Sequence, residues 1–374
     1  MTSMLASIIK SRLADLRILL ADEGLDGLLV SGSENRRYLS GFTAREEILH
    51  ESCGSLLITN DAALLLTDFR YQEWAQAEVS EFDILTYHAG IGTALAEQLG
   101  VWRVHRLGFE SSYLTFGQYQ RLTKAAANAG LEVEWAPTDG LVEGLREVKI
   151  PEEVARVRRA LEITEKVFAE VAALLRPGLS ERRIAWEIER RLREGGAEGL
   201  AFPPIVAAGA NSARPHHRPG SYRIQEKEPI IIDMGGRVAG YCADFTRTVI
   251  LGEAPERFRE IYTIVRRAQA RAEAGLKAGM ESLAGDALAR EVIVQAGFGE
   301  AFGHSLGHGV GLEVHEAPSL SPIKERNTVL QAGSIVTVEP GIYLSGWGGV
   351  RLEDMALIQA DRAEILTQFE FYDF

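Results

Sequence analysis

The length, composition and charge of the chain limit what kind of protein it can be. With 374 residues, 46% hydrophobic and 25% charged, it has the profile of a soluble globular protein long enough for two domains. A formal net charge of −13 argues against a nucleic-acid partner, which requires a basic surface. The two cysteines exclude a disulfide framework and favour a reducing, cytoplasmic compartment. Charges interrupt the first apolar stretch, so neither a signal peptide nor a membrane span is expected.

The first third of the sequence predicts an α/β domain over residues 1–145. Apolar residues recur at helical spacing between Ile8 and Leu20, which predicts an amphipathic helix. The turn pair Asn60-Asp61 separates two apolar runs and predicts a hairpin. Strands that alternate with helices are typical of an α/β domain. The expected strands are 27–31, 55–59 and 62–67, with others near Ile84, Leu107 and Val133.

A change of pattern marks a second, α+β domain, which we expect to span residues 146–374. Pro151 and the two acids after it favour a helix start, because proline fits the first turn and acids stabilise the positive end of the helix dipole. The apolar face of this helix continues to Leu175, before a Pro177-Gly178 stop. Three more helices are expected, from Ser180 to Gly195, after Pro255 and after Ser282.

Residues 229–251 predict a hairpin with one aspartate in each strand, although strand interiors disfavour that residue. A reversal near Val238 would place Asp233 opposite Asp244. Two carboxylates at such a distance repel each other, and one takes up a proton unless a cation lies between them. The pattern favours a cation site, and the alternative is a pair of turn acids on a solvated hairpin end.

The same arrangement recurs near the C-terminus. Residues 334–344 and 349–358 predict two strands, and a reversal near Gly346 would place Glu339 opposite Glu353. Carboxylates combined with imidazole suit divalent ions such as Mn²⁺, Co²⁺, Fe²⁺ or Zn²⁺. Because four carboxylates exceed what one such ion needs, we expect two ions about 3.5–4 Å apart that share them.

A glycine-rich stretch with three histidines lies between the two hairpins. It runs from His304 through His308 to His315, with a glycine on each side of His308. Glycine lets the backbone approach whatever the histidines surround, and clustered imidazoles are typical of metal or catalytic sites. The alternative is a glycine-rich turn with hydrogen-bonded histidines.

In their order and spacing these motifs resemble the pita-bread metallopeptidases, the family of prolidase, aminopeptidase P, methionine aminopeptidase and the metal-free creatinase. The segments 35–42 and 65–71 resemble a creatinase-type N-terminal domain, which methionine aminopeptidases lack. The resemblance is therefore strongest to bacterial Xaa-Pro peptidases, and it implies an α/β creatinase-like domain followed by an α+β pita-bread catalytic domain. The metal ligands that it implies are Asp233, Asp244, His308, Glu339 and Glu353.

The resemblance also implies roles for residues around the metals. His216, which follows Asn211-Ser-Ala-Arg-Pro, matches the catalytic histidine of the family. Catalytic roles are implied for His216, Glu339, His304, His315 and Arg351, and substrate contacts for His304, His315 and Tyr343.

The activity that the resemblance implies is metal-dependent hydrolysis of the Xaa-Pro bond at the N-terminus of dipeptides or short peptides. A hydroxide bridging two ions, Mn²⁺ or Co²⁺ before Zn²⁺ or Fe²⁺, would attack the scissile carbonyl. His216 would donate to the oxyanion, and Glu339 would pass the proton to the leaving amine. A homodimer is expected. Two alternatives stay open: a creatinase-like C–N hydrolase acting on a small non-peptide substrate, and a binding module without catalysis.

Two residues near these motifs are expected to have no chemical role. We expect His217 to be a solvated neighbour of His216, and Cys242 to be a small buried filler. Arg351 has an alternative interpretation as a charged strand residue on a wet face.

Overall fold

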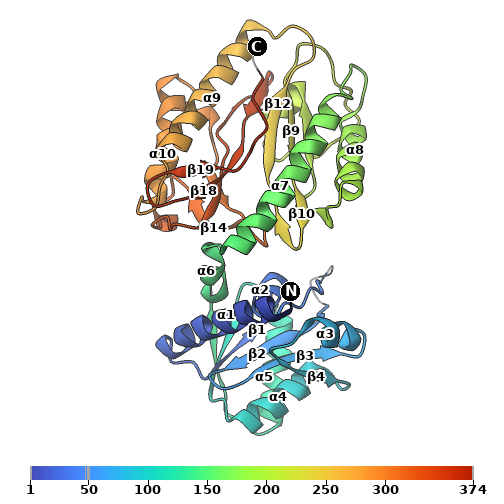
Figure 1. The fold of residues 1–374 in the computed structure, drawn as a ribbon, viewed down its shortest axis with the longest axis vertical. Helices are drawn as coiled ribbons and strands as arrows, with labels where there is room; N and C mark the ends of the chain where they lie inside the picture. Colours follow the sequence, from blue (N-terminus) through green and yellow to red (C-terminus); the bar gives the residue numbers. More distant parts are fainter. Residues whose placement is uncertain (1, 47, 49–50, 373–374) are drawn as a thin grey trace. The chain divides into compact units, whose positions relative to one another are not determined.

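The computed structural model describes residues 2–46, 48 and 51–372. The chain forms two compact units, Met1–Arg146 and Glu147–Phe374 (Figure 1). The first is α/β and the second α+β, as the sequence predicts. None of the helices in the described residues combines the length and hydrophobicity that a membrane span requires.

A six-stranded mixed sheet forms the centre of the first unit. The predicted hairpin is present, and its strands pair antiparallel from Ser55 opposite Leu66 to Ile58 opposite Ala63. The strands lie in the order β4 (Asp83–Tyr87), β3 (Ala63–Asp68), β2 (Ser55–Thr59), β1 (Gly27–Val30), β5 (Arg106–Glu110) and β6 (Glu134–Thr138).

Helices complete this unit by burying their apolar faces. The predicted opening helix is present, with Leu16 and Leu20 fully buried. Leu95 and Leu122 come from two other helices and pack in one cluster with the sheet residue Leu107. The helices are α1 (Thr2–Asp22), α2 (Ser33–Ser40), α3 (Gln72–Glu78), α4 (Ile91–Trp102), α5 (Phe116–Asn128) and α6 (Leu141–Glu147).

The second unit contains the four predicted helices, α7 (Pro151–Ala172), α8 (Glu181–Glu194), α9 (Glu256–Gly275) and α10 (Ser282–Gln295). At the start of α7 the Glu153 carboxylate accepts the Ile150 N–H at 2.8 Å. The helix ends earlier than Leu175, where the prediction placed its end. Pro177 disfavours a helical conformation of the residue before it, and the chain tightens into i→i+3 bonds such as Leu174 N–H to Val171 O.

The strands of this unit form several small sheets between two pairs of helices. In Figure 1, α7 and α8 lie beside one group of strands, and α9 and α10 lie beside the other. The first group is β7 (Gly199–Leu200), β8 (Ile205–Ala208), β9 (Ile230–Met234), β10 (Gly236–Val238), β11 (Tyr241–Cys242) and β12 (Phe245–Val249). The second group is β13 (Gly307–Gly309), β14 (Glu316–Leu320), β15 (Ile335–Val338), β16 (Gly341–Leu344), β17 (Gly348–Arg351), β18 (Asp354–Ile358) and β19 (Ala363–Ile365).

Packing against the helices holds both groups of strands in place. Phe168 of α7 meets Phe245 of β12 edge to face, with ring centroids 5.0 Å apart. On the other side Ile261 and Val265 of α9 share a core cluster with Val336 of β15. Burial of each such side chain stabilises the fold by about 1.5–3 kcal/mol, so the strands form a rigid base for polar side chains on their inner faces.

Candidate metal centre and active-site cleft

In the first predicted carboxylate pair, Asp233 lies on β9 and Asp244 directly precedes β12, and the register differs by two residues from the prediction. Asp233 faces Thr246, not Asp244. The chain reverses at Ala239-Gly240, both at positive φ, and glycine adopts that conformation at no steric cost. Because side chains two apart on a strand point to the same face, Asp244 still lies diagonally beside Asp233.

The second pair has the predicted register. Val338 of β15 pairs with Asp354 of β18. Glu339 directly follows β15 and Glu353 directly precedes β18, so the same register places them opposite each other. The two long strands that the sequence predicts are instead interrupted here and continue as β16 and β17. Pro340 explains the interruption, because proline lacks an N–H to donate to a ladder.

The glycines around His308 allow its strand to fit between two others. Strand β13 pairs with both β14 and β15. A Cβ at Gly307 would collide with the carbonyl of Thr337, and one at Gly309 with the carbonyl of Ala317. The close approach brings the imidazole of His308 to the inner faces of the carboxylate strands.

Imidazole and carboxylates converge there on one point. The ligand atoms offered by Asp244, His308 and Glu353 all lie within 4.8 Å of one another. His308 Nε2 is 3.2 Å from Glu339 Oε1 and 3.7 Å from Asp244 Oδ2. Oδ1 of Asp233 is buried and has no hydrogen-bond partner among the described residues. A buried acceptor without a donor, beside crowded carboxylates, fits a cation as its partner.

The pKa values of these groups show how strongly the site favours positive charge. Burial, followed by repulsion from neighbouring carboxylates, raises the pKa of Asp244 and of Glu353 well above the usual range. Burial also tends to raise the pKa of Glu339, but the hydrogen bond and charge of His308 outweigh it and lower this pKa to about 2. A divalent cation relieves such repulsion in place of a proton, so the donor set fits the metal ions.

Arg351 forms one end of a polar chain behind the carboxylates. Its Nη2 donates to Asp233 Oδ2 at 2.5 Å and its Nη1 to the Tyr343 hydroxyl at 2.9 Å. That hydroxyl is 2.9 Å from Nε2 of His304, whose Nδ1 is 2.8 Å from the Ser305 carbonyl. A carbonyl only accepts, so Nδ1 carries the proton of the neutral ring and Tyr343 donates to Nε2. The arginine side chain is 4% exposed, and its alternative interpretation as a residue on a wet face is wrong.

One cleft of about 1080 Å³ brings these groups together. The His315 ring stands edge to face against His308, with centroids 4.3 Å apart. His216 is exposed at the wall of the cleft, and Tyr343 stands behind His304. The predicted site residues that line the cleft are His216, Asp233, Asp244, His304, His308, His315, Glu339, Arg351 and Glu353, and His217 lines it as well.

Comparison with known families agrees with this geometry. The model of metallopeptidase family M24 matches residues 155–360, and that of the creatinase/prolidase N-terminal domain matches residues 12–148. The chain belongs to metallopeptidase family M24. It is therefore a metallopeptidase by family, and the family implies divalent metal ions. The expected fold, a creatinase-like domain followed by a pita-bread catalytic domain, is confirmed.

Relatives and solved structures match the chain over almost its whole length. An uncharacterized peptidase of Bacillus subtilis is 37% identical over 95% of this chain and 97% of the relative. The structure of an Xaa-Pro dipeptidase from Bacillus anthracis is 37% identical, with a TM-score of 0.91 over 97% of this chain and 99% of that one. An X-Pro aminopeptidase from Thermotoga maritima is 35% identical, with a TM-score of 0.83 over 93% and 97%.

Two threonines that support the carboxylates of this M24 site were not singled out in the sequence. Thr246 donates its hydroxyl to Glu353 Oε2 at 2.7 Å. Thr337 donates to Glu339 Oε1 at 3.2 Å and accepts the His308 N–H at 3.0 Å. Each threonine lies two residues from a predicted ligand, so strand alternation was a signal that would have placed it on the same face.

The expectation that His217 is a solvated neighbour of His216 is wrong. Its side chain is 10% exposed, and its Nε2 lies 2.9 Å from Oε2 of the buried Glu181. The segment is not extended there, because the His217 N–H donates to the Arg214 carbonyl and closes a turn. Cys242, in contrast, is the buried filler that the sequence predicts.

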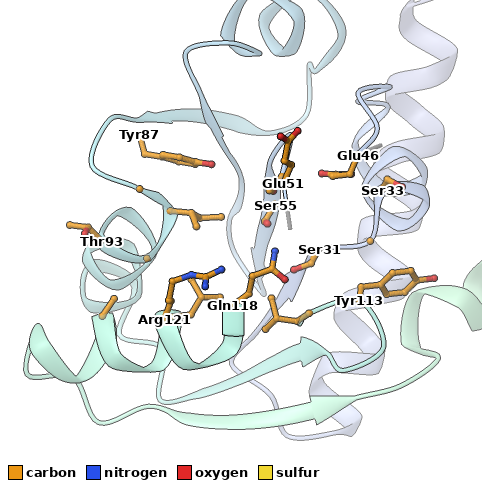
Figure 2. A pocket seen from close by; sticks show the side chains of 18 of the residues that line it. Ser31, Ser33, Glu46, Glu51, Ser55, Tyr87, Thr93, Tyr113, Gln118 and Arg121 are labelled. Atoms are coloured by element: carbon orange, nitrogen blue, oxygen red, sulfur yellow. The ribbon is translucent and has the colours of Figure 1, made fainter. Parts of the chain in front are cut away.

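The first unit contains a cavity of its own, of about 810 Å³. Figure 2 shows Tyr87, Thr93, Gln118 and Arg121 around it, with Glu46 and Glu51 on the opposite side. Within residues 2–46, 48 and 51–372, the group of histidines and carboxylates close enough to hold an ion lies in the second unit. We therefore place the hydrolytic chemistry in the cleft of the second unit.

Proposed function

We propose that this chain hydrolyses the Xaa-Pro bond at the N-terminus of dipeptides or short peptides. The observation that carries the proposal is the convergence of Asp244, His308 and Glu353 within 4.8 Å of one another in an open cleft. Support for the substrate comes from relatives over both units, which are named Xaa-Pro dipeptidase and X-Pro aminopeptidase. Residues 1–145 are then the creatinase-type domain and 146–374 the catalytic domain.

Two divalent ions are proposed per chain, with Mn²⁺ or Co²⁺ as the first candidates. Carboxylates with a single imidazole suit such hard or borderline ions. When bound, the ions would supply a nucleophilic water at neutral pH and polarise the scissile carbonyl. The residues that would hold them are Asp233, Asp244, His308, Glu339 and Glu353.

The side chains of the cleft supply the rest of the chemistry. His216 would donate a hydrogen bond to the oxygen that becomes negative when the carbonyl is attacked. Glu339 would accept a proton from the attacking water at its carboxylate and pass it to the leaving proline nitrogen. The substrate's free α-amino group would be held beside the acidic cluster, which restricts cleavage to the first peptide bond.

Four other residues would position the substrate. Arg351 keeps the Asp233 carboxylate oriented through their 2.5 Å bond. Tyr343 fixes the ring of His304, which lines the cleft, by the hydrogen bond to its Nε2. Burial lowers the pKa of His315 as well as that of His304, and both would meet the peptide as neutral rings.

The test is a substrate panel run on the chelated and reconstituted protein. We expect EDTA to abolish hydrolysis of Ala-Pro and Mn²⁺ or Co²⁺ to restore it, with elemental analysis approaching two ions per chain. N-acetyl-Ala-Pro should resist, and Ala-Pro-Ala decides between dipeptidase and aminopeptidase. Hydrolysis of creatine but not of Ala-Pro would establish the C–N hydrolase instead, and full activity without metal would refute the proposal.

Compartment and assembly are further parts of the proposal. We propose a cytoplasmic homodimer, and the two free, buried cysteines fit a reducing compartment. Sedimentation equilibrium should give twice the 41.1 kDa chain mass. A monomer at micromolar concentration, or a periplasmic location on cell fractionation, would contradict this part alone.

A further inference from the structure

The segment that carries His216 has no helix or strand to hold it in place. Residues 214–220, all described in the structure, lie outside helices and strands. His216 itself is exposed, so burial does not fix the direction of its ring. A group that donates to a developing charge must be preorganised, because a misplacement of about 1 Å costs on the order of 100-fold in rate. Something else in the fold must hold the segment.

A single buried carboxylate binds the segment on both sides of His216. Glu181, at the start of α8, is fully buried. Its Oε1 accepts the Ala208 N–H and the Asn211 amide, each at 3.0 Å. Its Oε2 accepts the Gly220 N–H at 3.0 Å and contacts His217 Nε2 at 2.9 Å. One oxygen thus binds the chain before His216 and the other binds it after.

The opposite side of the segment is attached to the carboxylate strands. Ser212 Oγ accepts the Gly349 N–H at 2.8 Å, which joins the short 3₁₀ turn Gly209–Ala213 to β17. Nη1 of Arg351 lies 3.4 Å from the Pro215 carbonyl, directly before His216. The backbone on either side of His216 is therefore bonded to Glu181 through Gly220 and to the Arg351 strand through Pro215.

We infer that Glu181 is a positioning residue for His216, and that His217 is the side chain through which it holds the segment. The inference deepens the proposed function, because it rests on His216 acting in hydrolysis. Glu181 does not face the cleft and does not touch the substrate. It acts by fixing the backbone between Ala208 and Gly220.

The chemistry of the carboxylate fits this role. Burial alone would raise the pKa of Glu181, but hydrogen bonds from His217, Asn211 and two backbone N–H groups outweigh it and lower the pKa. Both oxygens therefore stay acceptors at neutral pH. Glutamine has the same shape but one oxygen, so its NH₂ group would face the backbone N–H of Ala208 or of Gly220, neither of which can accept a hydrogen bond. Glu181→Gln is thus a minimal change that should release one side of the segment.

The experiment is a double-mutant cycle on Ala-Pro with wild type, Glu181→Gln, His216→Ala and the double variant. We expect Glu181→Gln to lower kcat about 10- to 100-fold, with KM and metal content within about twofold of wild type. In the His216→Ala background the same change should alter kcat less than about twofold. Equal fold losses in both backgrounds would show a general structural role and overturn the inference, as would no loss in either.

Variants at His217 test the same link without touching the carboxylate. His217→Gln keeps an N–H donor and should retain most of kcat, whereas His217→Leu should lose about as much as Glu181→Gln. If Glu181→Gln does not fold, His217→Leu takes its place in the cycle. Equal kcat for the Gln and Leu variants would overturn the role of His217. Glu189→Gln, on the exposed face of the same helix, is the matched control and should leave kcat unchanged.

Amide hydrogen exchange gives a readout that needs neither metal nor substrate. In the metal-free protein, Glu181→Gln should speed exchange at Ala208 and Gly220 at least tenfold and leave β18 unchanged. Unchanged exchange at both amides would overturn the inference. If wild type does not cleave Ala-Pro at all, the proposed function fails, while the exchange result still decides whether Glu181 holds the segment.

Discussion

Replacing Asp244 with Asn should stabilise the metal-free protein while it abolishes the metal-dependent activity. Burial, then the charges of Glu353, Asp233 and Glu339, raises the pKa of Asp244 well above 3.8 in the folded state. Below pH 3.8 both folded and unfolded chains hold this proton, so it has no effect on stability. As pH rises from there to the folded pKa, the unfolded chain releases the proton and the folded one keeps it, so folding becomes steadily less favourable. Asn has nearly the same shape and no charge, and it removes this cost.

The size of the effect follows from the linkage. Each unit of pKa difference corresponds to about 1.4 kcal/mol, so a pKa held well above its usual value in the folded state costs more than about 1.4 kcal/mol at pH 7. We expect Asp244→Asn to raise the free energy of unfolding by about 2 kcal/mol at pH 7 with chelator present. For a unit of this length, Tm rises by about 2–4 °C per kcal/mol, which gives about 4–8 °C.

Scanning calorimetry with and without Mn²⁺ checks both halves of this prediction. At 100 times its Kd, a metal ion stabilises wild type by about 2.7 kcal/mol, and the variant should lack this gain. The order of Tm values should therefore reverse when Mn²⁺ is added. Asp361→Asn, at an exposed turn, is the control and should stay within about 0.5 kcal/mol. A lower Tm of Asp244→Asn in chelator at pH 7 would refute the electrostatic reasoning, and unchanged Mn²⁺ binding would refute the assignment of Asp244 as a ligand.

Three further substitutions have defined outcomes. His216→Ala should lower kcat about 100- to 1000-fold while plasma emission spectrometry finds unchanged metal content, and a loss of metal would show that His216 is a ligand. Thr246→Val removes the 2.7 Å hydrogen bond to a proposed ligand and should weaken Mn²⁺ binding about 10- to 100-fold in calorimetric titration; equal affinity would contradict this supporting role. The Lys149 ammonium lies 2.6 Å from the Glu316 carboxylate, whose side chain is 3% exposed. Lys149→Met removes this cation and leaves the buried carboxylate without it. Urea denaturation should show a loss of about 3–5 kcal/mol, and a loss below 1 kcal/mol would mean that water replaces the amine.

The register of the two carboxylate hairpins was predictable from local sequence patterns in one case and not in the other. The second hairpin was predictable in register, because Gly346 marks the reversal and the side-chain period of a strand carries the pairing back to Glu339 and Glu353. The first hairpin was not, because Val238 and Ala239-Gly240 are both compatible with a turn. The predicted register was wrong by two residues, but a shift of two keeps Asp233 and Asp244 on one face of the sheet, so the two carboxylates were still predicted to lie together.

The sequence patterns by themselves determined the α/β and α+β classes, the opening helix, the four helices of the second unit and the two carboxylate pairs, because periodicity and turn residues encode which side chains share a face. The choice of His308 and His216 came from the resemblance to a known family. Only the tertiary structure decided how each donor is held. Arg351 reaches Asp233 across 118 positions of sequence, and Glu181 reaches Gly220 across 39. No local pattern encodes such pairs, because they form only when packing brings distant strands and helices together and excludes water from between them. His217 is a further example. The sequence predicts a solvated neighbour of His216, because the contact of His217 with the buried carboxylate of Glu181 forms only in the folded chain.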